Sequence, residues 1–598
     1  MAEYDIIVVG AGNAALAAAV SARENGARVL VLEKAPKNMR GGNTHWSGGL
    51  FRFAYGEPQN VKPLIPEAEH QHENFYEGIK PYSVEDFHED LMRVTNGRTD
   101  PVLSRVIVEN SKDTVFWMGD VGGIEMEPAI SVAAVRKGNG FVWLRGLVLR
   151  AVHEGVGLST SWFNTCEKMG IEVRYESAAL SLVLNDGGRV CGVKVRDAMG
   201  IRSISADAVI LGCGGFEANA QMRTQHIGPL LGEAKVRGTP HNQGDGLRMA
   251  LDIGAMPWGQ WSGCHATPIS ADWGDFAPRE MTDRSNRLSY PYAVMINRAG
   301  RRFVDEGENT QLMTYAKFGR AILAQPGSKA YQIFDSSVVH LLEPRYSTSK
   351  PISADSLPAL IDQLDIDNKE QAKATLAQYN AAARLLPGKT VQRSGPADGA
   401  VEKNNRTETD EGYESFNLAD DAGKKSASLV SSASSASGSS PGSVDFLKNF
   451  DPTRLDGLAT QGLDLNKTNW ALPLVKPPFV AYGATGGITF TFGGLRINEQ
   501  AEVIGTDWRP IPGLYACGEM VGGLYYDNYP AGTGLVSGAT IGRIAGRSAA
   551  LRKPLLDQPS PGRAAPNGAT SSSEVLTAAL MPQHDSPPTA GRLEGWVP

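Results

Sequence analysis

The sequence contains little cysteine: there are five in 598 residues, and they lie far apart. This spacing provides neither a disulfide framework nor a Cys-x-x-Cys metal site, and it fits a reducing compartment. His70 and His72 stand close together, but no third ligand follows at a suitable spacing. We therefore expect no metal centre.

Long apolar runs and clustered basic charge are also lacking. A membrane-spanning helix needs about 20 apolar residues in succession, and no such run occurs. The chain starts on the strand-like segment 4–9, without the basic and apolar regions of a signal peptide. We therefore expect a cytoplasmic protein without a transmembrane segment. Because the formal net charge is −7 and no long basic run occurs, nucleic acid is not an expected partner.

What is present first is a strand, a glycine turn, a helix and a second strand within residues 4–33. Gly10 permits a tight turn, Gly12 lets the backbone approach a pyrophosphate, and Ala15 lets the helix pack closely on the strand. The helix N-terminus then faces the phosphates, and Glu33 can bind a ribose hydroxyl. This unit predicts dinucleotide binding; the alternative is a purely structural glycine turn.

Further glycine clusters favour FAD over NAD. They occur at 41–49, 212–215 and 513–519, and a long flavin nucleotide needs close backbone approach at several points. The last cluster ends a strand with Gly518-Glu519, whose acid could hold the ribityl chain. The sequence therefore predicts FAD as the cofactor.

Periodicity predicts further elements along the chain. We expect a helix at 101–118, helices interrupted by glycines at 143–169, and a β-meander at 171–195. From 386 to 443 the composition changes to charged residues, glycine and serine, which cannot bury enough apolar surface to fold. We expect a disordered insertion there and a disordered tail at 553–598.

The order of these motifs resembles that of the fumarate reductase and succinate dehydrogenase flavoprotein superfamily. The resemblance rests on the N-terminal turn with Glu33 and on later motifs at Gly41-Gly-Asn-Thr44, Gly244-Asp-Gly246, Gly300-Arg-Arg-Phe-Val-Asp-Glu306, Gly493-Gly494 and Gly513-Leu-Tyr-x-x-Gly-Glu519. The segments 302–307, 314–317 and 487–494 look most like the FAD-dependent tricarballylate dehydrogenase branch.

The resemblance implies an α/β fold: a Rossmann-like FAD-binding domain of the glutathione-reductase type with an inserted α+β capping domain. The FAD-binding domain would comprise residues 1–257 and 488–552. The capping domain, which closes on the substrate, would comprise 258–487 and carry the insertion at 386–443.

Motifs and resemblance together assign a set of residues to FAD. The expected cofactor-binding residues are Gly10, Gly12, Asn13, Ala14, Ala15, Glu33, Lys34, Gly41, Gly42, Asn43, Thr44, Ser47, Gly48, Gly49, Ala178, Gly214, Gly215, Asp245, Gly518, Glu519, Gly534, Leu535 and Val536.

The mode of FAD attachment follows from the loop at Gly41-Gly42. In relatives with covalent FAD, the tethering histidine occupies the place that Asn43 holds here, not that of His45, so we expect noncovalent FAD. For His45 itself, packing or backbone hydrogen bonding and a role near the flavin remain alternatives.

The resemblance also implies the chemistry: a hydride moves between flavin N5 and a carbon next to an electron-withdrawing group, and a protein group moves a proton at the neighbouring carbon. His265, in Cys264-His-Ala-Thr267, takes the place of a substrate-contacting histidine. The arginine acid of fumarate reductases corresponds to Thr310, a second substrate histidine to Thr489, and a substrate arginine to the Tyr529-Pro530 region. Fumarate reduction by the arginine mechanism is therefore not expected.

Other groups must then supply the proton and bind the substrate. Tyr529 stands in a Tyr-Pro-x-Gly segment similar to one in 3-ketosteroid dehydrogenases, where the tyrosine polarises a carbonyl. Tyr315 is a candidate base because the ammonium of Lys317 would favour its phenolate; the alternative for both tyrosines is burial with a satisfied hydroxyl. Among arginines that could bind carboxylates we favour Arg287; each candidate could instead form a salt bridge, and the others are Arg52, Arg145 and Arg302.

The resulting hypothesis is an FAD-dependent dehydrogenase. It would oxidise a C–C bond beside a carboxylate or carbonyl of a small organic acid, such as a tricarballylate-like polycarboxylate. The alternatives are an enoate or fumarate-type reductase, a 3-ketosteroid-dehydrogenase-like enzyme, and a catalytically inactive flavin-binding scaffold. A quinone, an iron–sulfur partner and oxygen all remain possible electron acceptors.

Overall fold

The computed structural model describes residues 2–66, 75–76, 79–130, 134–137, 140–143, 146–384, 447, 449–452 and 454–552. Four features named above lie outside this part: the His70 and His72 pair, Arg145, the 386–443 insertion and the 553–598 tail.

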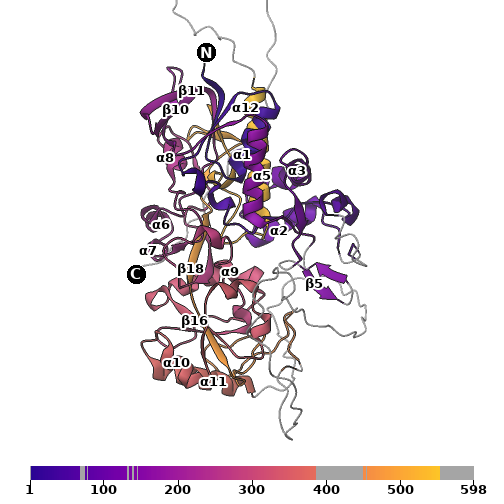
Figure 1. Cartoon of the computed structure of the whole chain (residues 1–598), viewed down its shortest axis with the longest axis vertical. Helices are drawn as coiled ribbons and strands as arrows, with labels where there is room; N and C mark the ends of the chain where they lie inside the picture. The colour runs from indigo at the N-terminus through magenta and orange to yellow at the C-terminus, as the bar shows by residue number, and fades with distance from the viewer. Residues whose placement is uncertain are drawn as a thin grey trace, which may run out of the picture. The chain divides into compact units, whose positions relative to one another are not determined.

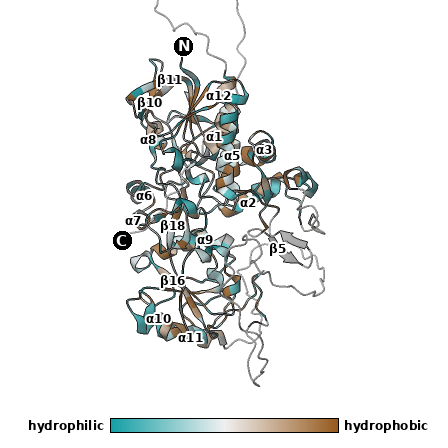
Figure 2. Ribbon diagram, in the orientation of Figure 1, coloured by the Kyte–Doolittle hydropathy of each residue, from teal (hydrophilic) through white to brown (hydrophobic). Residues whose placement is uncertain are grey.

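The first sheet is built on the expected β-α-β unit. It comprises β1 (Tyr4–Val9), α1 (Asn13–Glu24) and β2 (Val29–Leu32), and the two strands run parallel. The strand order is β20-β21-β11-β1-β2-β8, with a β9–β10 hairpin pairing onto β11. The other strands are β8 (Glu172–Arg174), β9 (Ala178–Leu184), β10 (Val190–Asp197), β11 (Gly200–Leu211), β20 (Glu502–Ile504) and β21 (Pro510–Ala516). The central strands are hydrophobic, as a sheet buried on both faces requires (Figure 2).

The alanine-rich sequence of α1 allows a very close helix pair. α12 (Thr533–Leu551) lies beside α1 (Figure 1). A Cβ on Gly542 would stand 2.3 Å from the carbonyl oxygen of Ala14, and one on Gly546 would stand 2.2 Å from that of Ala18. Small residues on both helices therefore bring the N-terminal and C-terminal segments of the first sheet together.

A second, mixed sheet carries the α+β part of the chain. Its path is β12-β18-β16-β15, with β14 and β17 also paired to β18. The strands are β12 (Lys235–Val236), β14 (Cys264–Ser270), β15 (Val294–Asn297), β16 (Ala330–Phe334), β17 (Ile352–Ala354) and β18 (Phe479–Thr491). The helices of this part are α9 (Gln311–Leu323), α10 (Leu357–Gln363) and α11 (Lys369–Arg384). The expected α/β class is confirmed, and the expected domain boundary at residue 487 falls inside β18.

The prediction for residues 143–169 is wrong. This segment contains β7 (Leu149–Ala151) and then one uninterrupted helix, α5 (Glu154–Lys168), which includes both glycines. A Cβ on Gly155 would stand 2.0 Å from the carbonyl oxygen of Thr44. The glycine therefore brings α5 against the Gly41–Gly49 loop instead of breaking the helix.

Two other expectations have mixed outcomes. The helix expected at 101–118 is α3 (Pro101–Asp120), capped by the Asp100 carboxylate. The meander is confirmed for β9 and β10, but β8 instead pairs in parallel with β2. None of the helices in the described part of the chain has both the length and the apolar character needed to cross a bilayer.

The remaining helices and strands are short or peripheral. Among them are η2 (Gly42–Thr44), α2 (Val84–Val94), α6 (Ala220–His226), α7 (Pro229–Gly232), α8 (Asp245–Leu251), η10 (Gly518–Met520), β3 (Leu50–Phe51), β4 (Met126–Pro128), β5 (Ala134–Lys137), β6 (Gly140–Trp143), β13 (Pro257–Trp258) and β19 (Gly494–Leu495).

Candidate active site

One large cavity collects most of the expected site residues. Those that line it are Gly10, Gly12, Asn13, Ala14, Glu33, Lys34, Gly42, Asn43, Thr44, Ser47, Gly48, Gly214, Asp245, Gly518, Glu519, Gly534 and Leu535, together with His265, Tyr315, Thr489 and Tyr529. Of the expected set, Ala15, Gly41, Gly49, Ala178, Gly215, Val536, Arg287 and Lys317 are not part of its lining. The cavity has a nucleotide end at the first sheet and an aromatic end at β14 and β18.

The nucleotide end begins at the turn between β1 and α1. Gly10 has φ +101°, and a Cβ there would stand 2.6 Å from the carbonyl oxygen of Gly212, so only glycine fits. Gly12 caps α1 and Gly532 caps α12, and neither helix has a side-chain cap. Amides at both helix N-termini are therefore available to an anion such as a pyrophosphate.

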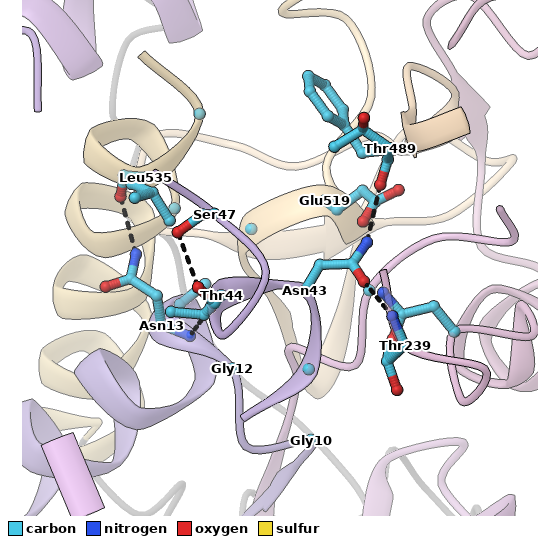
Figure 3. A pocket seen from close by; sticks show the side chains of 18 of the residues that line it. Gly10, Gly12, Asn13, Asn43, Thr44, Ser47, Thr239, Thr489, Glu519 and Leu535 are labelled. Atoms are coloured by element: carbon cyan, nitrogen blue, oxygen red, sulfur yellow. Dashed lines mark hydrogen bonds between the residues drawn. The ribbon is translucent and has the colours of Figure 1, made fainter. Parts of the chain in front are cut away.

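The loop beside this turn is held by two asparagines (Figure 3). Asn13 donates from Nδ2 to the Leu535 carbonyl (2.8 Å), and its backbone N–H donates to Thr44 Oγ1 (2.9 Å). Asn43 donates from Nδ2 to the Thr489 carbonyl (2.7 Å) and accepts at Oδ1 from the Thr239 amide (2.9 Å). These bonds fix the loop against α12 and β18.

His45 takes no part in lining the cavity. Its ring packs edge-on against Trp46, with the ring centroids 5.3 Å apart. Burial and the nearby charge of Arg279 lower the pKa of His45 to about 4. The structure therefore places His45 in the packing role that was one of its two alternatives.

Charged residues at the nucleotide end suit a ribose. Glu33 is buried at the end of β2, and its Oε1 accepts from the Ala35 amide (2.8 Å). Burial raises the pKa of Glu33. Lys34 and Asp245 form an ion pair on the same wall. A glycine cradle, uncapped helix ends and a buried acid fit the pyrophosphate and ribose of FAD.

The aromatic end is built around a β-bulge. His265 on β14 pairs with Phe490, whereas Ala266 pairs with Ile488, so Thr489 is the extra residue of β18. His265 stacks on Phe490 (centroids 5.3 Å apart, 11° between planes) and meets Tyr315 and Tyr529 edge-on at 4.8 and 5.1 Å. The bulge thus turns Phe490 toward this cluster and leaves Thr489 free to bind polar groups.

His265 is a neutral member of the cluster. It is 2% exposed, and neither ring nitrogen has a hydrogen-bond partner among the described residues. Burial and the charge of Arg237 lower its pKa to about 3. Its imidazole therefore stays uncharged over the physiological pH range.

Arg237 is the cation that faces this cluster, and the sequence did not reveal it. It follows β12, lines the cavity, and donates from Nε to Thr489 Oγ1 (3.0 Å) and from Nη1 to the Trp46 carbonyl (3.2 Å). Its charge opposes the rise in pKa that burial causes in Tyr315 and Tyr529. Arg237 stands seven positions before the nearest motif glycine, and no pattern marked it.

The two tyrosines nevertheless remain phenols. Burial, the charge of Tyr529 and a hydrogen bond with it raise the pKa of Tyr315 well above its usual value. Burial also raises the pKa of Tyr529, although its hydrogen bond with Tyr315 acts in the opposite direction. The pair therefore holds its protons at neutral pH.

The other arginine of the cavity is neutralised. Arg345 forms an ion pair with Asp283 (2.6 Å) and a longer one with Glu343 (3.3 Å). Among the lining residues that the structure describes, Lys34 is likewise paired, whereas Arg237 forms no ion pair. Among these lining residues, Arg237 is therefore the cation at the aromatic end that is not held in an ion pair, although the Asp283 carboxylate acts on its charge. Arg345 and Asp283 were also missed, because the segments that carry them match no motif.

Two catalytic expectations do not fit the structure. Arg287 is buried away from the cavity, where it donates to the Asn286 carbonyl (2.8 Å) and to Ser349 Oγ (2.6 Å). Lys317 is 57% exposed and ion-paired with Glu308 (2.5 Å). The ammonium expected beside Tyr315 is thus engaged elsewhere, and Arg237 takes its place.

The remaining arginine candidates also have other partners. Arg302 is ion-paired with Glu306, and Arg52 donates from Nε to the Ala531 carbonyl (2.8 Å). Neither lines the cavity.

A cavity with a dinucleotide cradle at one end and a polar aromatic wall at the other is that of a flavoprotein oxidoreductase. The chain belongs to the FAD binding domain family, whose model matches residues 5–535. The expected cofactor, FAD, is thereby confirmed.

Known relatives cover nearly the whole chain. It is 27% identical over 555 residues to fumarate reductase (cytochrome) of Shewanella frigidimarina, covering 91% of this chain and 77% of the relative. It is 26% identical to 4-oxocyclohexanecarboxylate 2-dehydrogenase of Sinomonas cyclohexanicum, covering 92% and 93%. The solved 3-ketosteroid delta1-dehydrogenase of Sterolibacterium denitrificans has the same fold, with a TM-score of 0.62 at 19% identity, covering 92% and 99%. The expectation of an FAD-dependent enzyme is confirmed.

Proposed function

We propose that this enzyme dehydrogenates a C–C bond next to a carbonyl or a single carboxylate of a small organic acid or ketone. The observation that carries the proposal is the pairing of Arg237, a cation without an ion pair among the described residues, with a wall of His265, Tyr315, Phe490 and Tyr529. A tricarballylate-like substrate would bring three carboxylates to this one cation, so we favour a substrate with a single anchoring group.

The protein's own groups have distinct parts in this reaction. When bound, FAD supplies the hydride acceptor. Arg237 binds the carbonyl or carboxylate oxygen, and its charge favours negative charge that develops there. The Tyr315–Tyr529 pair takes the proton from the neighbouring carbon through the small fraction in which one hydroxyl is ionised, a form that Arg237 favours and burial opposes. Phe490 and the neutral His265 exclude water from the reacting carbons.

The test is anaerobic mixing of the oxidised enzyme with saturated compounds of three kinds. A cyclic keto acid or a saturated monocarboxylate should bleach the flavin absorbance, and tricarballylate should not. Tyr529→Phe and Tyr315→Phe should slow the bleaching by about 10²- to 10⁴-fold while leaving the oxidised spectrum unchanged. Bleaching by tricarballylate alone would contradict the proposed substrate class, and wild-type rates of bleaching in both variants would remove the tyrosines from the mechanism.

The reverse direction is a second candidate, because the fumarate reductase of Shewanella frigidimarina covers most of the chain. Chemically reduced enzyme mixed with enones and enoates measures it. Faster oxidation of the flavin by these compounds than reduction by their saturated forms would favour a reductase.

We also propose that FAD is bound noncovalently. Asn43 holds the position of the tether, and its amide is used in hydrogen bonds to Thr489 and Thr239. Acid precipitation should leave the yellow colour in the supernatant. Colour retained in the pellet would show a covalent bond.

A further inference from the structure

A pair of carboxyl groups lies behind the flavin cavity. Glu217, which follows β11, is fully buried, and its Oε1 accepts from Asn43 Nδ2 (2.6 Å) and from Asn242 Nδ2 (2.5 Å). Its Oε2 has no donor among the described residues. Glu519 on η10 lies within hydrogen-bonding reach of Glu217. Glu519 also lines the cavity (Figure 3).

Glu519 is the member of the pair suited to carry the negative charge. Its Oε1 accepts from the Thr491 amide (2.7 Å) and from Thr491 Oγ1 (3.0 Å). A Cβ on Gly215 would stand 2.2 Å from this oxygen, so the backbone also approaches it closely. Burial raises the pKa of Glu519, but the hydrogen bonds from the Thr491 amide and hydroxyl act in the opposite direction, so Glu519 ionises before Glu217.

Two buried carboxylates in contact cannot both be ionised. Burial and the charge of Glu519 raise the pKa of Glu217 well above its usual value. Arg223 on α6 also lies near it and donates from Nη1 to the Glu217 backbone carbonyl (2.6 Å), not to its carboxyl. A proton on Oε2 supplies the donor that the protein otherwise lacks there.

We propose that Glu217 is a protonated positioning residue of the FAD site, donating to Glu519 on the cavity wall and accepting from Asn43 of the cofactor loop. The pair then places one negative charge, and not two, beside the cofactor. Asn43 extends the network, because it also binds the Thr489 carbonyl, and Thr489 binds Arg237. Glu217 thus links the position of the flavin loop to that of the arginine at the aromatic end.

Substitutions separate this role from simple packing. Glu217→Gln replaces the proposed O–H donor with an N–H donor and keeps the acceptor for Asn43, whereas Glu217→Ala removes both. Glu519→Gln removes the neighbouring negative charge, so burial alone then keeps the proposed proton on Glu217. Glu233→Gln changes an exposed carboxyl near α7 and serves as the control.

Infrared spectra of the FAD-loaded protein provide the direct measurement. We expect the C=O stretch of a protonated carboxylic acid, sensitive to exchange into heavy water, in the wild type, Glu519→Gln and Glu233→Gln, and its loss in Glu217→Gln. Persistence of this band in Glu217→Gln, or its absence from the wild type, overturns the proposal.

Titration of the apoproteins with FAD, followed by flavin fluorescence, provides the second measurement. Glu217→Gln should bind FAD as the wild type does, and Glu217→Ala should bind about tenfold more weakly or worse, since buried partners lose their hydrogen bonds. Circular dichroism confirms that each apoprotein is folded. Wild-type affinity in Glu217→Ala, or equal losses in the Gln and Ala variants, would overturn the positioning role.

Discussion

Arg237 is the residue on which the proposed activity depends most. Arg237→Met should lower kcat/KM by about 10²- to 10³-fold, the effect of losing about 3–4 kcal/mol of charge-assisted hydrogen bonding in a buried site. Arg237→Lys should restore only part of it, because one ammonium cannot reproduce the bonds to Thr489 and Trp46 while also binding substrate. Steady-state kinetics on the FAD-loaded variants measure both effects.

A neighbouring arginine provides the control for this charge. Arg284 is exposed and donates to the Glu280 carbonyl (2.9 Å). Arg284→Met should leave kcat/KM within about twofold of the wild type, as expected for a surface side chain. A comparable loss in both variants would mean that Arg237 acts through the overall field and not through contact.

His265 makes the free energy of unfolding depend on pH in the acidic range. Its folded pKa of about 3 lies below the unfolded value, so the unfolded chain takes up a proton first as the pH falls. The stability that neutral His265 provides is present above about pH 6.5 and is lost as the pH falls from there toward 3. Between pH 7 and 5 the loss should be about 2 kcal/mol in urea unfolding. His265→Phe keeps the stack on Phe490 and should lose less; an equal loss would contradict this assignment.

At the residue scale, the sequence predicted the cofactor end far better than the substrate end. Glycines such as Gly10 and Gly12 act through the backbone at fixed spacing, which a linear pattern records. Arg237 and Tyr529 line the same cavity only because β12, β18 and the segment before α12 converge. No spacing in the sequence indicates this convergence. Lys317 failed as a partner of Tyr315 because two positions along a helix point in different directions.

At the scale of elements, α5 depends on Gly155. Gly155→Ala would place a Cβ 2.0 Å from the Thr44 carbonyl oxygen and force the helix away from the cofactor loop. We expect FAD affinity to fall about tenfold or more and thermal stability to fall, although alanine usually stabilises a helix by about 1 kcal/mol. Fluorescence titration with FAD and thermal unfolding measure the two effects.

The matched control is Gly274→Ala, where a new Cβ meets nothing within 4 Å. FAD affinity and thermal stability should be unchanged there. Unchanged FAD affinity in Gly155→Ala as well would show that the Gly41–Gly49 loop tolerates movement of α5.

The wrong prediction for α5 also comes from the close contact that Gly155 makes. A glycine lowers helix propensity, so two of them within four residues predicted interruptions, but propensity is outweighed when the missing Cβ creates a packing contact. The β-α-β unit was predictable because its periodicity, turn and helix agree with one another.

At the scale of the molecule, Lys467 makes the free energy of unfolding depend on pH in the alkaline range. It is buried, and its Nζ donates to the Ala293 carbonyl (2.8 Å). Burial lowers its pKa to about 8, with the nearby charge of Glu306 opposing. Between about pH 8 and the unfolded value of 10.5 the unfolded chain binds the extra proton, so stability should rise with pH through that window, by up to about 3 kcal/mol.

Urea unfolding at pH 7 and pH 10 tests this dependence. Lys467→Met removes the titrating group while retaining an unbranched chain. The gain in stability between the two pH values should be smaller in Lys467→Met by the amount that Lys467 contributes. Identical pH dependence in both proteins would show that the ammonium is solvated in the folded state.

The α/β class was predictable, but the extent of β18 in the second sheet was not. β18 continues past residue 487, where the sequence suggested a domain boundary. The apolar residues and glycines of this strand mark no break at that position, so the sequence could not show where the strand ends.

The bulge at Thr489 has a consequence for how this enzyme can diversify. An extra residue in a strand lies outside the regular alternation, so its side chain can be exchanged without moving Ile488 or Phe490 from their own faces. Thr489 accepts a hydrogen bond from Arg237 at its side-chain hydroxyl and one from Asn43 of the Gly41–Gly49 loop at its backbone carbonyl. Only the hydroxyl would change when the side chain is exchanged. Substitutions at residue 489 could therefore change substrate specificity during evolution with little effect on the sheet or on FAD binding.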